Sequence, residues 1–363
     1  MPQRSVDGER ATNVAIRPLD DSNRAAVVAF MGRVLDRPQS QEFEDWRYRQ
    51  CPTMEAATAM AGNDCVATMF ALQRTYHTPD GDTECLEPFE WHANEEWRAQ
   101  APGLRLVKHY MKGSKPLVAV TGTKMARGLL ERLKWQRIAT AERFALPLTG
   151  RYWAQRGYGT VVTRLFDLAG RSLFAPRRPR TSALILEPAG AFAPPVAALA
   201  ARQRRFALMR LPDASTVQWL RRAPATVGHY VTLHARLENE LIGWVSARIF
   251  RHSEQRAGEL LEVFLADDMR SWYPTLVAKA SATLAGFGAD VLLATTTCPD
   301  TVAALKRLRF RPAGQSAVLV WWGGAPAPKG PVLIDGAFSD HSFFPLPTAS
   351  AAAWLEGPAR DPR

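Results

Sequence analysis

The chain has 363 residues, of which 47% are hydrophobic and 22% charged, and its formal net charge is +11. This composition excludes a disordered chain, and the length predicts two domains at roughly 100–200 residues each. No apolar run approaches the roughly 20 residues of a membrane span, and the start "MPQRSVDGER" lacks the apolar stretch of a secretion signal, so we expect a cytoplasmic protein. The four cysteines form no C-x-x-C pair and predict buried free thiols.

The positive charge suits nucleic acid, anionic lipid or phosphate-rich small molecules as partners. However, only 8 of the 46 basic residues are Lys, in a chain rich in Ala and Arg. The clearest basic runs, "APRRPR" (175–180) and "ARQRR" (201–205), contain no interleaved aromatic ladder. Nucleic-acid binding is therefore not expected.

Hydrophobic periodicity divides the first part of the chain into strands and helices. Strands are predicted at 14–19, 54–60, 65–73, 83–91, 116–121 and 142–148. Three helices are predicted: one at 23–35, one that begins after Pro102, and one that ends at Leu133. An amphipathic stretch (152–174) and a Pro- and Arg-rich linker follow.

The second part begins with a predicted hairpin, 229–236 and 241–250. Strands at 258–266, 290–297 and 316–322 follow, with a helix at 272–287 and another that Asp300 is expected to cap. The tail from 323 is largely irregular. Its "DGAFSDH" (335–341) contains Asp335, Asp340 and His341, which we interpret as a polar turn rather than a metal site.

The two parts repeat one another. "ARGLLERLKWQRIA" (126–139) has a counterpart in "TVAALKRLRFRPAG" (301–314), and an offset of 175 residues aligns 84–136 with the second copy without a gap. Glu87 then falls on Glu262, and Trp97 on Trp272. The sequence therefore predicts an internal duplication.

The order of elements resembles the GNAT superfamily of acyl-CoA-dependent N-acyltransferases. "LLERLKWQR" and "ALKRLRFRP" are similar to the family's final helix and Gly-Phe strand start, with Lys134-Trp135 and Arg309-Phe310 in the Gly-Phe place. "FEDWRYRQCP" (43–52) resembles a segment of GNAT-like proteins from bacterial envelope and exopolysaccharide gene sets.

This resemblance implies an α/β (α+β) fold of two tandem units, each a mixed, mostly antiparallel sheet flanked by helices. The units are expected at 14–148 and 205–322, joined by a helical and Pro/Arg-rich linker at 149–204 and followed by an irregular tail at 323–363.

In this family a [QR]-x-x-G-x-[GA] segment holds the pyrophosphate of the coenzyme at a helix N-terminus. "RAQAPG" (98–103) matches it at Arg98, Ala101 and Gly103, with Ala in place of the first Gly. The second copy has "YPTLVA" (273–278), without the Arg or the glycines. The resemblance thus implies acyl-CoA as co-substrate, bound by the first unit.

Glu87 and Glu262 have a spacing similar to that of the family's strand glutamate, and a carboxylate buried there gains a higher pKa, which suits a general base. Pairing with arginines such as Arg132 and Arg307 is the structural alternative. His92 is another possible base.

The last helix departs from the pattern of many GNAT enzymes, and the role of two tryptophans is open. Leu130 and Leu305 stand where many GNAT enzymes carry, on the last helix, a Tyr that protonates the leaving thiolate. Trp46 and Trp219 either line an acceptor pocket or anchor a core, and the second role is the more common one.

These features favour transfer of an acetyl or related acyl group to an amine or amino-sugar acceptor. The alternatives are a non-catalytic tandem module that binds a ligand or partner, and an aminoacyl-tRNA-dependent transferase of envelope synthesis. The sequence indicates neither the acceptor nor the oligomeric state.

Overall fold

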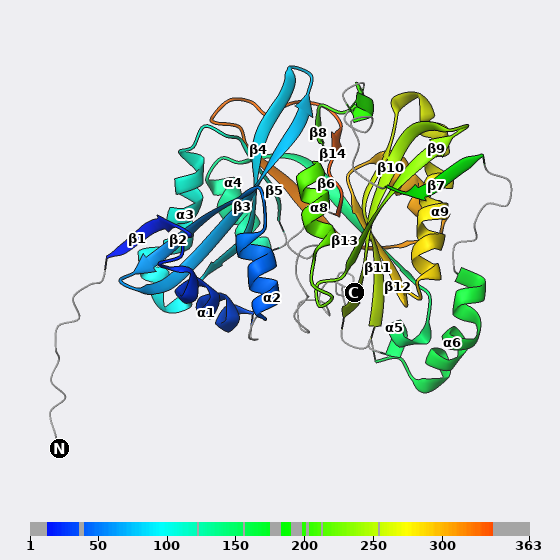
Figure 1. Ribbon diagram of the computed structural model, residues 1–363, viewed down its shortest axis with the longest axis horizontal. Coiled ribbons are helices and arrows are strands. Elements are labelled where there is room, and N and C mark those ends of the chain that lie inside the picture. Colours follow the sequence, from blue (N-terminus) through cyan, green and yellow to red (C-terminus); the bar gives the residue numbers. More distant parts are fainter. Residues whose placement is uncertain are drawn as a thin grey trace, which may run out of the picture.

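The computed structural model describes residues 13–35, 40–121, 123–154, 157–174, 183–189, 198–200, 203–211, 213–252 and 255–336. Its helices and strands form two groups that share one continuous sheet (Figure 1). The predicted mixed α/β class, with two tandem units, is confirmed.

The first group follows the predicted order closely. Its strands are β1 (Val14–Pro18), β2 (Met54–Ala61), β3 (Asp64–Thr78), β4 (Gly81–Ala93), β5 (Leu117–Thr121) and β6 (Gln136–Pro147). Its helices are α1 (Arg24–Val34), α2 (Gln41–Glu44), η1 (Asp45–Arg49), η2 (Glu95–Gln100), α3 (Pro102–Met111) and α4 (Lys124–Arg132). The connecting region contains α5 (Gly150–Ala154), α6 (Thr160–Phe174) and β7 (Leu184–Pro188).

The second group repeats this order. Its strands are β8 (Leu208–Arg210), β9 (His229–Leu237), β10 (Glu240–His252), β11 (Gln255–Leu265), β12 (Val291–Thr296), β13 (Arg311–Trp321) and β14 (Val332–Leu333). Its helices are α8 (Ala214–Arg221), η3 (Asp267–Trp272), α9 (Tyr273–Gly286) and α10 (Pro299–Arg307). The predicted cap of α10 was wrong, because Cys298 is the N-cap and Asp300 lies inside the first turn, where it pairs with Arg205 and Arg270.

The two groups exchange their closing strands. The order along the sheet is β1-β2-β3-β4-β5-β13-β6-β12-β11-β10-β9-β7, so β13 pairs with β5 of the first group and β6 pairs with β12 of the second. Figure 1 shows β6 and β13 in the middle of the molecule. Each half of the sheet is therefore completed by a strand from the other half.

The repeated phrase of the sequence has the same conformation in both copies. Lys134 and Arg309 have left-handed backbones, with φ of 68° and 67°. The N–H of the following residue returns to the helix in both, from Trp135 to the Leu130 carbonyl (3.1 Å) and from Phe310 to the Leu305 carbonyl (3.0 Å). This is the helix-ending geometry that usually selects Gly, which explains the match to a Gly-Phe motif.

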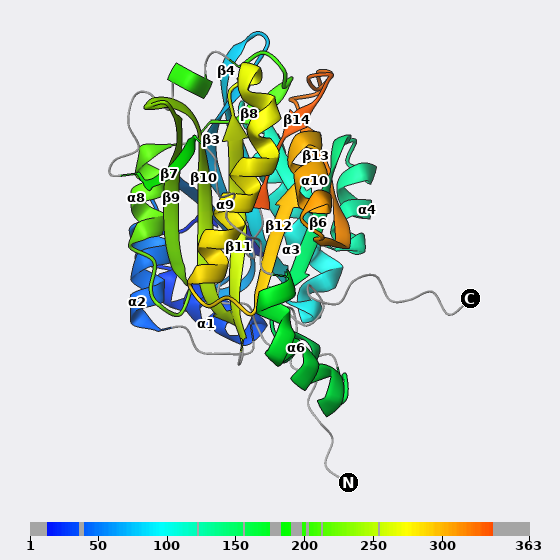
Figure 2. The ribbon, with the colours of Figure 1, turned by 90° about the vertical axis from the view of Figure 1, so that its right-hand side faces the viewer.

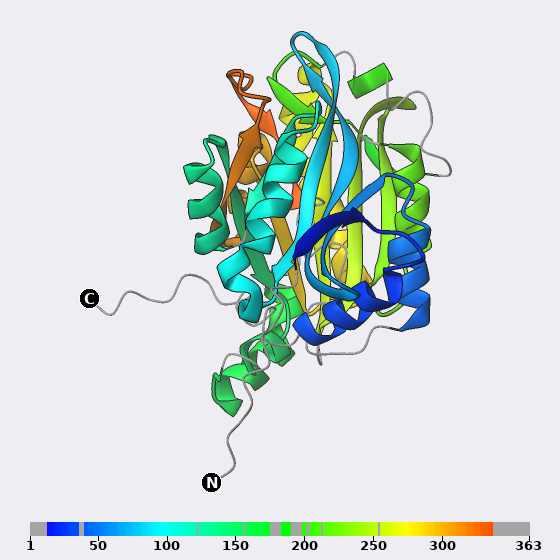
Figure 3. The ribbon, with the colours of Figure 1, turned by 90° about the vertical axis from the view of Figure 1, so that its left-hand side faces the viewer.

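Apolar side chains fill both faces of the sheet. On the outer face, α3 and α4 pack on the first half (Figure 3), and α9 and α10 pack on the second. On the inner faces, α1, η1 and α8 lie where the two groups meet, and one core cluster contains residues of both, including Phe70 and Leu261.

Trp46 and Trp219 mark the centre of this contact. Their rings stack with centroids 4.5 Å apart, and each indole N–H donates to the backbone carbonyl of the other residue, at 2.9 and 2.8 Å. Both side chains are buried. These tryptophans therefore anchor the core between the two groups, which was the more common of the two roles considered.

Candidate functional site

Each group contains a gap between two parallel strands. β4 and β5 pair only at Leu86 and Leu117, although β4 continues to Ala93. β11 and β12 pair from Ala257 to Leu260, although β11 continues to Leu265. Beyond these residues the two strands of each pair are no longer hydrogen-bonded to one another. A helix, α3 or α9, begins shortly after β4 or β11 ends.

The predicted phosphate cradle lies beside the first gap. Arg98 is exposed on η2, and Ala101 is left-handed with φ of 47°, in a position that glycine adopts more readily. Pro102 is the first residue of α3 and has no N–H, so Gly103 and Leu104 supply the N–H groups of the first turn that have no intrahelical acceptor. The helix N-terminus thus retains donors that suit an anion.

Gly103 packs closely against Trp91. A Cβ at this position would lie 3.0 Å from the Trp91 indole nitrogen, and that nitrogen donates a hydrogen bond of 3.1 Å to the Gly103 carbonyl. A side chain at this position would require the Trp91 ring to shift by a few tenths of an ångström.

The corresponding place in the second group is filled by side chains. Tyr273 is buried at the start of α9, and its hydroxyl accepts hydrogen bonds from the Leu265 N–H (3.3 Å) and the Arg205 guanidinium (3.1 Å). Arg205 is also paired with Asp300. An aromatic ring and an ion pair thus occupy the start of this helix. Arg270 lies in the last turn of η3, as Arg98 lies in the last turn of η2, and it pairs with Asp300.

The gap between β11 and β12 is filled by the segment 332–336. The Val263 N–H on β11 donates to the Asp335 carboxylate at 3.0 Å, and the Thr296 hydroxyl on β12 donates to the same carboxylate. The Thr297 N–H donates to the Ile334 carbonyl at 3.0 Å. Asp335 is buried, which raises its pKa to about 7. The segment therefore bridges the two strand edges.

Among the described residues, no such segment is hydrogen-bonded across the first gap. Pro88 stands at the position of Val263 and has no N–H with which to hold one. The two gaps, alike in backbone topology, therefore differ in what occupies them.

Glu87 and Glu262 meet at one arginine. Arg210 on β8 lies 3.7 Å from the Glu87 carboxylate and donates a hydrogen bond to Glu262. Burial lowers the pKa of Arg210, but the carboxylates of Glu262 and Glu87 outweigh this effect and raise the pKa above its ordinary value. The structural alternative considered from the sequence named Arg132 and Arg307 as partners of these glutamates, and both of those arginines are exposed. The arginines beside the glutamates are Arg210 and Arg74.

Glu87 is almost completely buried. It accepts a hydrogen bond of 2.9 Å from the Tyr76 hydroxyl and lies 4.0 Å from Arg74. Burial raises the pKa of Glu87, and the charges of Arg210 and Arg74 oppose that rise. This carboxyl group lies just beyond the last paired residue of β4 and β5.

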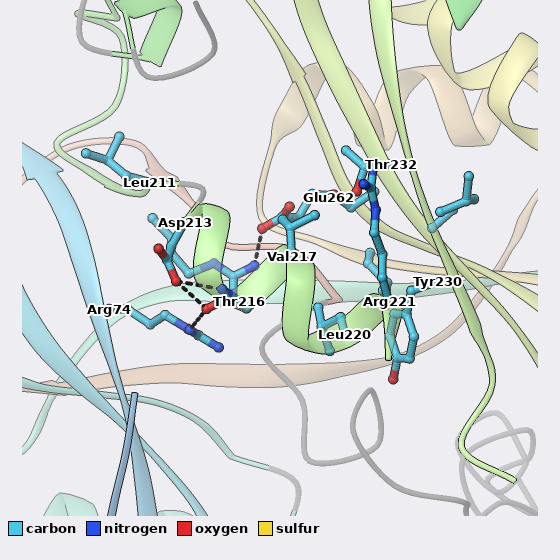
Figure 4. Close-up of a pocket in the computed structure, with 15 residues that line it drawn as sticks. Arg74, Leu211, Asp213, Thr216, Val217, Leu220, Arg221, Tyr230, Thr232 and Glu262 are labelled. Atoms are coloured by element: carbon cyan, nitrogen blue, oxygen red, sulfur yellow. Dashed lines mark hydrogen bonds and ion pairs between the residues drawn. The ribbon is translucent and has the colours of Figure 1, made fainter. Parts of the chain in front are cut away.

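Glu262 lines a small cavity between α8 and the sheet (Figure 4). In the paired strands β9, β10 and β11, Thr232 lies opposite Ser246, which lies opposite Glu262. The Ser246 hydroxyl is buried and has no hydrogen-bond partner among the described residues. The cavity volume of about 30 Å³ is room for one or two water molecules, so it accepts a small polar group.

The other residues considered from the sequence take peripheral or structural positions. His92 is near the end of β4, and burial lowers its pKa. Asp340 and His341 lie outside the described residues. Within the described ranges, no cluster of three or more His, Cys, Asp or Glu residues could hold a metal ion, and no helix is long and apolar enough to cross a membrane.

Several residues of the site were missed by sequence reasoning. Arg74, Tyr76 and Arg210 reach the glutamates from β3 and β8, and only the pairing of these strands brings them there. Ser246 was recognised as part of a strand, but its missing hydrogen-bond partner is visible only in the folded chain.

The structure resembles solved acyltransferases. A GCN5-related N-acetyltransferase from Anabaena variabilis matches with a TM-score of 0.58 and 9% identity over 86% of this chain and 73% of that one. Saccharomyces cerevisiae N-myristoyltransferase with bound myristoyl-CoA matches with a TM-score of 0.60 and 13% identity over 91% and 82%. A tandem GNAT protein from the clavulanic acid biosynthesis pathway, solved without AcCoA, matches with a TM-score of 0.53 and 13% identity over 86% and 100%.

No protein-family model matches the sequence, and no curated protein matches it. At these identities the likeness shows the fold alone, and that fold is the tandem GNAT arrangement predicted from the repeat.

Proposed function

We propose that the protein is an acyl-CoA-dependent N-acyltransferase in which the first unit binds the coenzyme and the second presents the acceptor. One observation carries the proposal: the gap beside Arg98 and Gly103 is not bridged by any described segment, whereas the matching gap is bridged by Asp335 and its neighbours. The duplicated fold has thus kept one strand gap and helix N-terminus available to a ligand.

The first unit supplies the groups that a coenzyme pyrophosphate requires. Arg98 contributes positive charge from η2, and the left-handed Ala101 turns the chain into α3. Gly103 lies in the first helical turn, where N–H groups without an intrahelical acceptor favour an anion. These three residues are the proposed coenzyme contacts.

The proposed reaction is attack of an acceptor amine on a thioester carbonyl, with formation of a C–N bond and release of the coenzyme thiolate. Glu262 is the proposed acceptor of the amine proton, because its carboxylate lines the cavity and is more exposed than that of Glu87. Arg210 positions Glu262, and Glu87 holds Arg210 from the other side. Removal of a positioned acid or base typically costs 10²–10⁴-fold in rate.

The polar row of Thr232, Ser246 and Glu262 favours an amine that carries hydroxyl groups, such as an amino sugar. The first unit has Met54 and Leu72 at the paired positions beside Glu87, so the row belongs to the second unit alone. Since the cavity holds only a small group, the reacting end of the acceptor is the part that enters it. An acetyl or related acyl donor, a bacterial cytoplasmic location and a role in exopolysaccharide synthesis complete the proposal, on the sequence resemblance.

Calorimetric titration with coenzyme A tests the coenzyme part. We expect one site per chain, and absence of binding at millimolar coenzyme A would refute the acyltransferase proposal in favour of a binding module. Thiol release from acetyl-CoA with glucosamine as the acceptor probe tests the catalytic part. Glu262→Gln should lower the rate by about 10²-fold or more while coenzyme affinity is retained. Equal rates for Glu262→Gln and wild type would remove Glu262 from the mechanism.

A further inference from the structure

Helix α6 carries apolar side chains on its solvent side. Val161 is 73% exposed, Leu165 60% and Leu168 82%. At 100° per residue these three positions share one face, whereas Phe166, on the opposite side, packs on Trp153 of α5 with ring centroids 5.0 Å apart. Figures 2 and 3 show α6 extending beyond the sheet. The amphipathic stretch predicted from the sequence thus turns its apolar face away from the protein.

A positively charged cavity adjoins this helix. Three exposed arginines line it, Arg151, Arg251 and Arg256, together with two aspartates. Both acids already have partners: Asp167, on α6 itself, accepts a hydrogen bond from the Gly150 N–H (2.8 Å), and Asp290 accepts from the Arg256 N–H (2.9 Å). The positive charges therefore outnumber the negative ones in this cavity.

The chain next to α6 adds further positive charge. Arg164 is exposed on the helix, between the apolar face and the face that carries Asp167. In the sequence, the run "APRRPR" (175–180) follows the helix directly. An apolar face bordered by arginines is the pattern of a helix that lies in the interface of an anionic membrane.

We propose that α6 is a membrane-surface anchor that inserts Val161, Leu165 and Leu168 among the lipids of an anionic bilayer. The arginines of the adjoining cavity face the phosphate groups of the lipid heads. Pairing of α6 with a second copy of the chain fits less well, because it would bring two arginine-rich surfaces together. This inference is independent of the proposed acyl transfer.

Sedimentation with vesicles tests the anchor. Wild-type protein should bind vesicles of phosphatidylglycerol and phosphatidylcholine, bind less in high salt and bind poorly to phosphatidylcholine alone. The double variant Leu165→Ser, Leu168→Ser should lose about tenfold or more of this affinity, because both side chains are exposed and lose only membrane contacts. Met125→Ser is the matched control, since Met125 is 75% exposed on α4, and it should bind like wild type.

Three results would overturn the proposal. The first is no vesicle binding by wild-type protein in low salt, and the second is equal binding by the double variant. The third is a dimer, detected by light scattering, that the double variant converts to monomer while vesicles are not bound. Arg151→Gln with Arg251→Gln should weaken binding to the anionic vesicles, and unchanged binding would exclude the cavity from lipid recognition. Thermal unfolding shows whether each variant is folded.

Discussion

Replacement of Arg98 by Ala should weaken coenzyme A binding without loss of stability. The side chain is exposed, and among the described residues it has no hydrogen-bond or ion-pair partner whose loss would destabilise the fold. A charge-assisted hydrogen bond to phosphate contributes about 1.5–3 kcal/mol, and about 1.4 kcal/mol is one decade of affinity. We therefore expect a tenfold to hundredfold rise in Kd, and a smaller rise in high salt because the site is open to solvent.

The assay is calorimetric titration of coenzyme A into matched variants. Arg307→Ala removes an exposed arginine from α10 of the second unit and should leave Kd unchanged. Tyr273→Phe removes only the hydroxyl that Arg205 and the Leu265 N–H contact, without the large cavity of an Ala substitution in the core, and should also leave Kd unchanged. The three variants thus separate the two possible coenzyme sites.

Wild-type affinity of Arg98→Ala for coenzyme A, together with weak binding by Tyr273→Phe, would contradict a coenzyme site in the first unit. In that case the coenzyme site belongs to the second unit, and the segment 332–336 has to leave the gap when the coenzyme binds. Urea unfolding of each variant distinguishes loss of a contact from loss of the fold.

The remaining predictions concern stability, measured as urea midpoints. At Lys134, whose backbone is left-handed, Gly should be more stabilising than Ala by about 1 kcal/mol. At Lys108, inside α3, Ala should instead be more stabilising than Gly by about 1 kcal/mol. The same preference at both positions would contradict the assigned helix ending. Because burial raises the pKa of Asp335 to about 7 from 3.8, the folded protein binds its proton more tightly than the unfolded chain, and stability falls as pH rises through this range. Asp335→Asn should therefore become more stable relative to wild type, by up to a few kcal/mol, between pH 4 and pH 7, and a constant difference would show that Asp335 does not titrate there.

The local elements were predictable because their signals are local. Period-two alternation located the hairpin of β9 and β10, and the repeated phrase located the ends of α4 and α10. Strand β7 was not predicted, since Leu184–Pro188 lies in a Pro- and Arg-rich stretch. It is a strand because β9 offers it an edge with which to pair. Strand exchange was not anticipated either. The closing strands β6 and β13 have similar patterns of apolar residues, so the sequence does not indicate which of them pairs with β5 and which with β12.

The candidate site was only partly predictable for a related reason. Glu87 and Glu262 were found from their spacing, and Arg98 and Gly103 from a motif, because these features lie within a few residues of each other in the sequence. Arg210 depends on a three-residue strand that pairs with β3 and β14, contacts that are distant in the sequence. The filling of the second gap depends on chain folding back from the tail, which composition alone described as irregular.

The duplication explains both the symmetry of the centre and the difference between its halves. Each unit contributes one tryptophan to the central stack and one glutamate to Arg210, so the two copies meet through equivalent residues. The exchange of closing strands then makes the halves interdependent: without the second half, β6 would lose both of its partners and β5 would become an exposed edge. Since neither half has a complete sheet alone, differences such as the buried Tyr273 at the start of α9 can accumulate in one copy while the backbone of both is retained. Of the two strand gaps, only that of the second copy is bridged by the segment 332–336, among the residues that the structure describes.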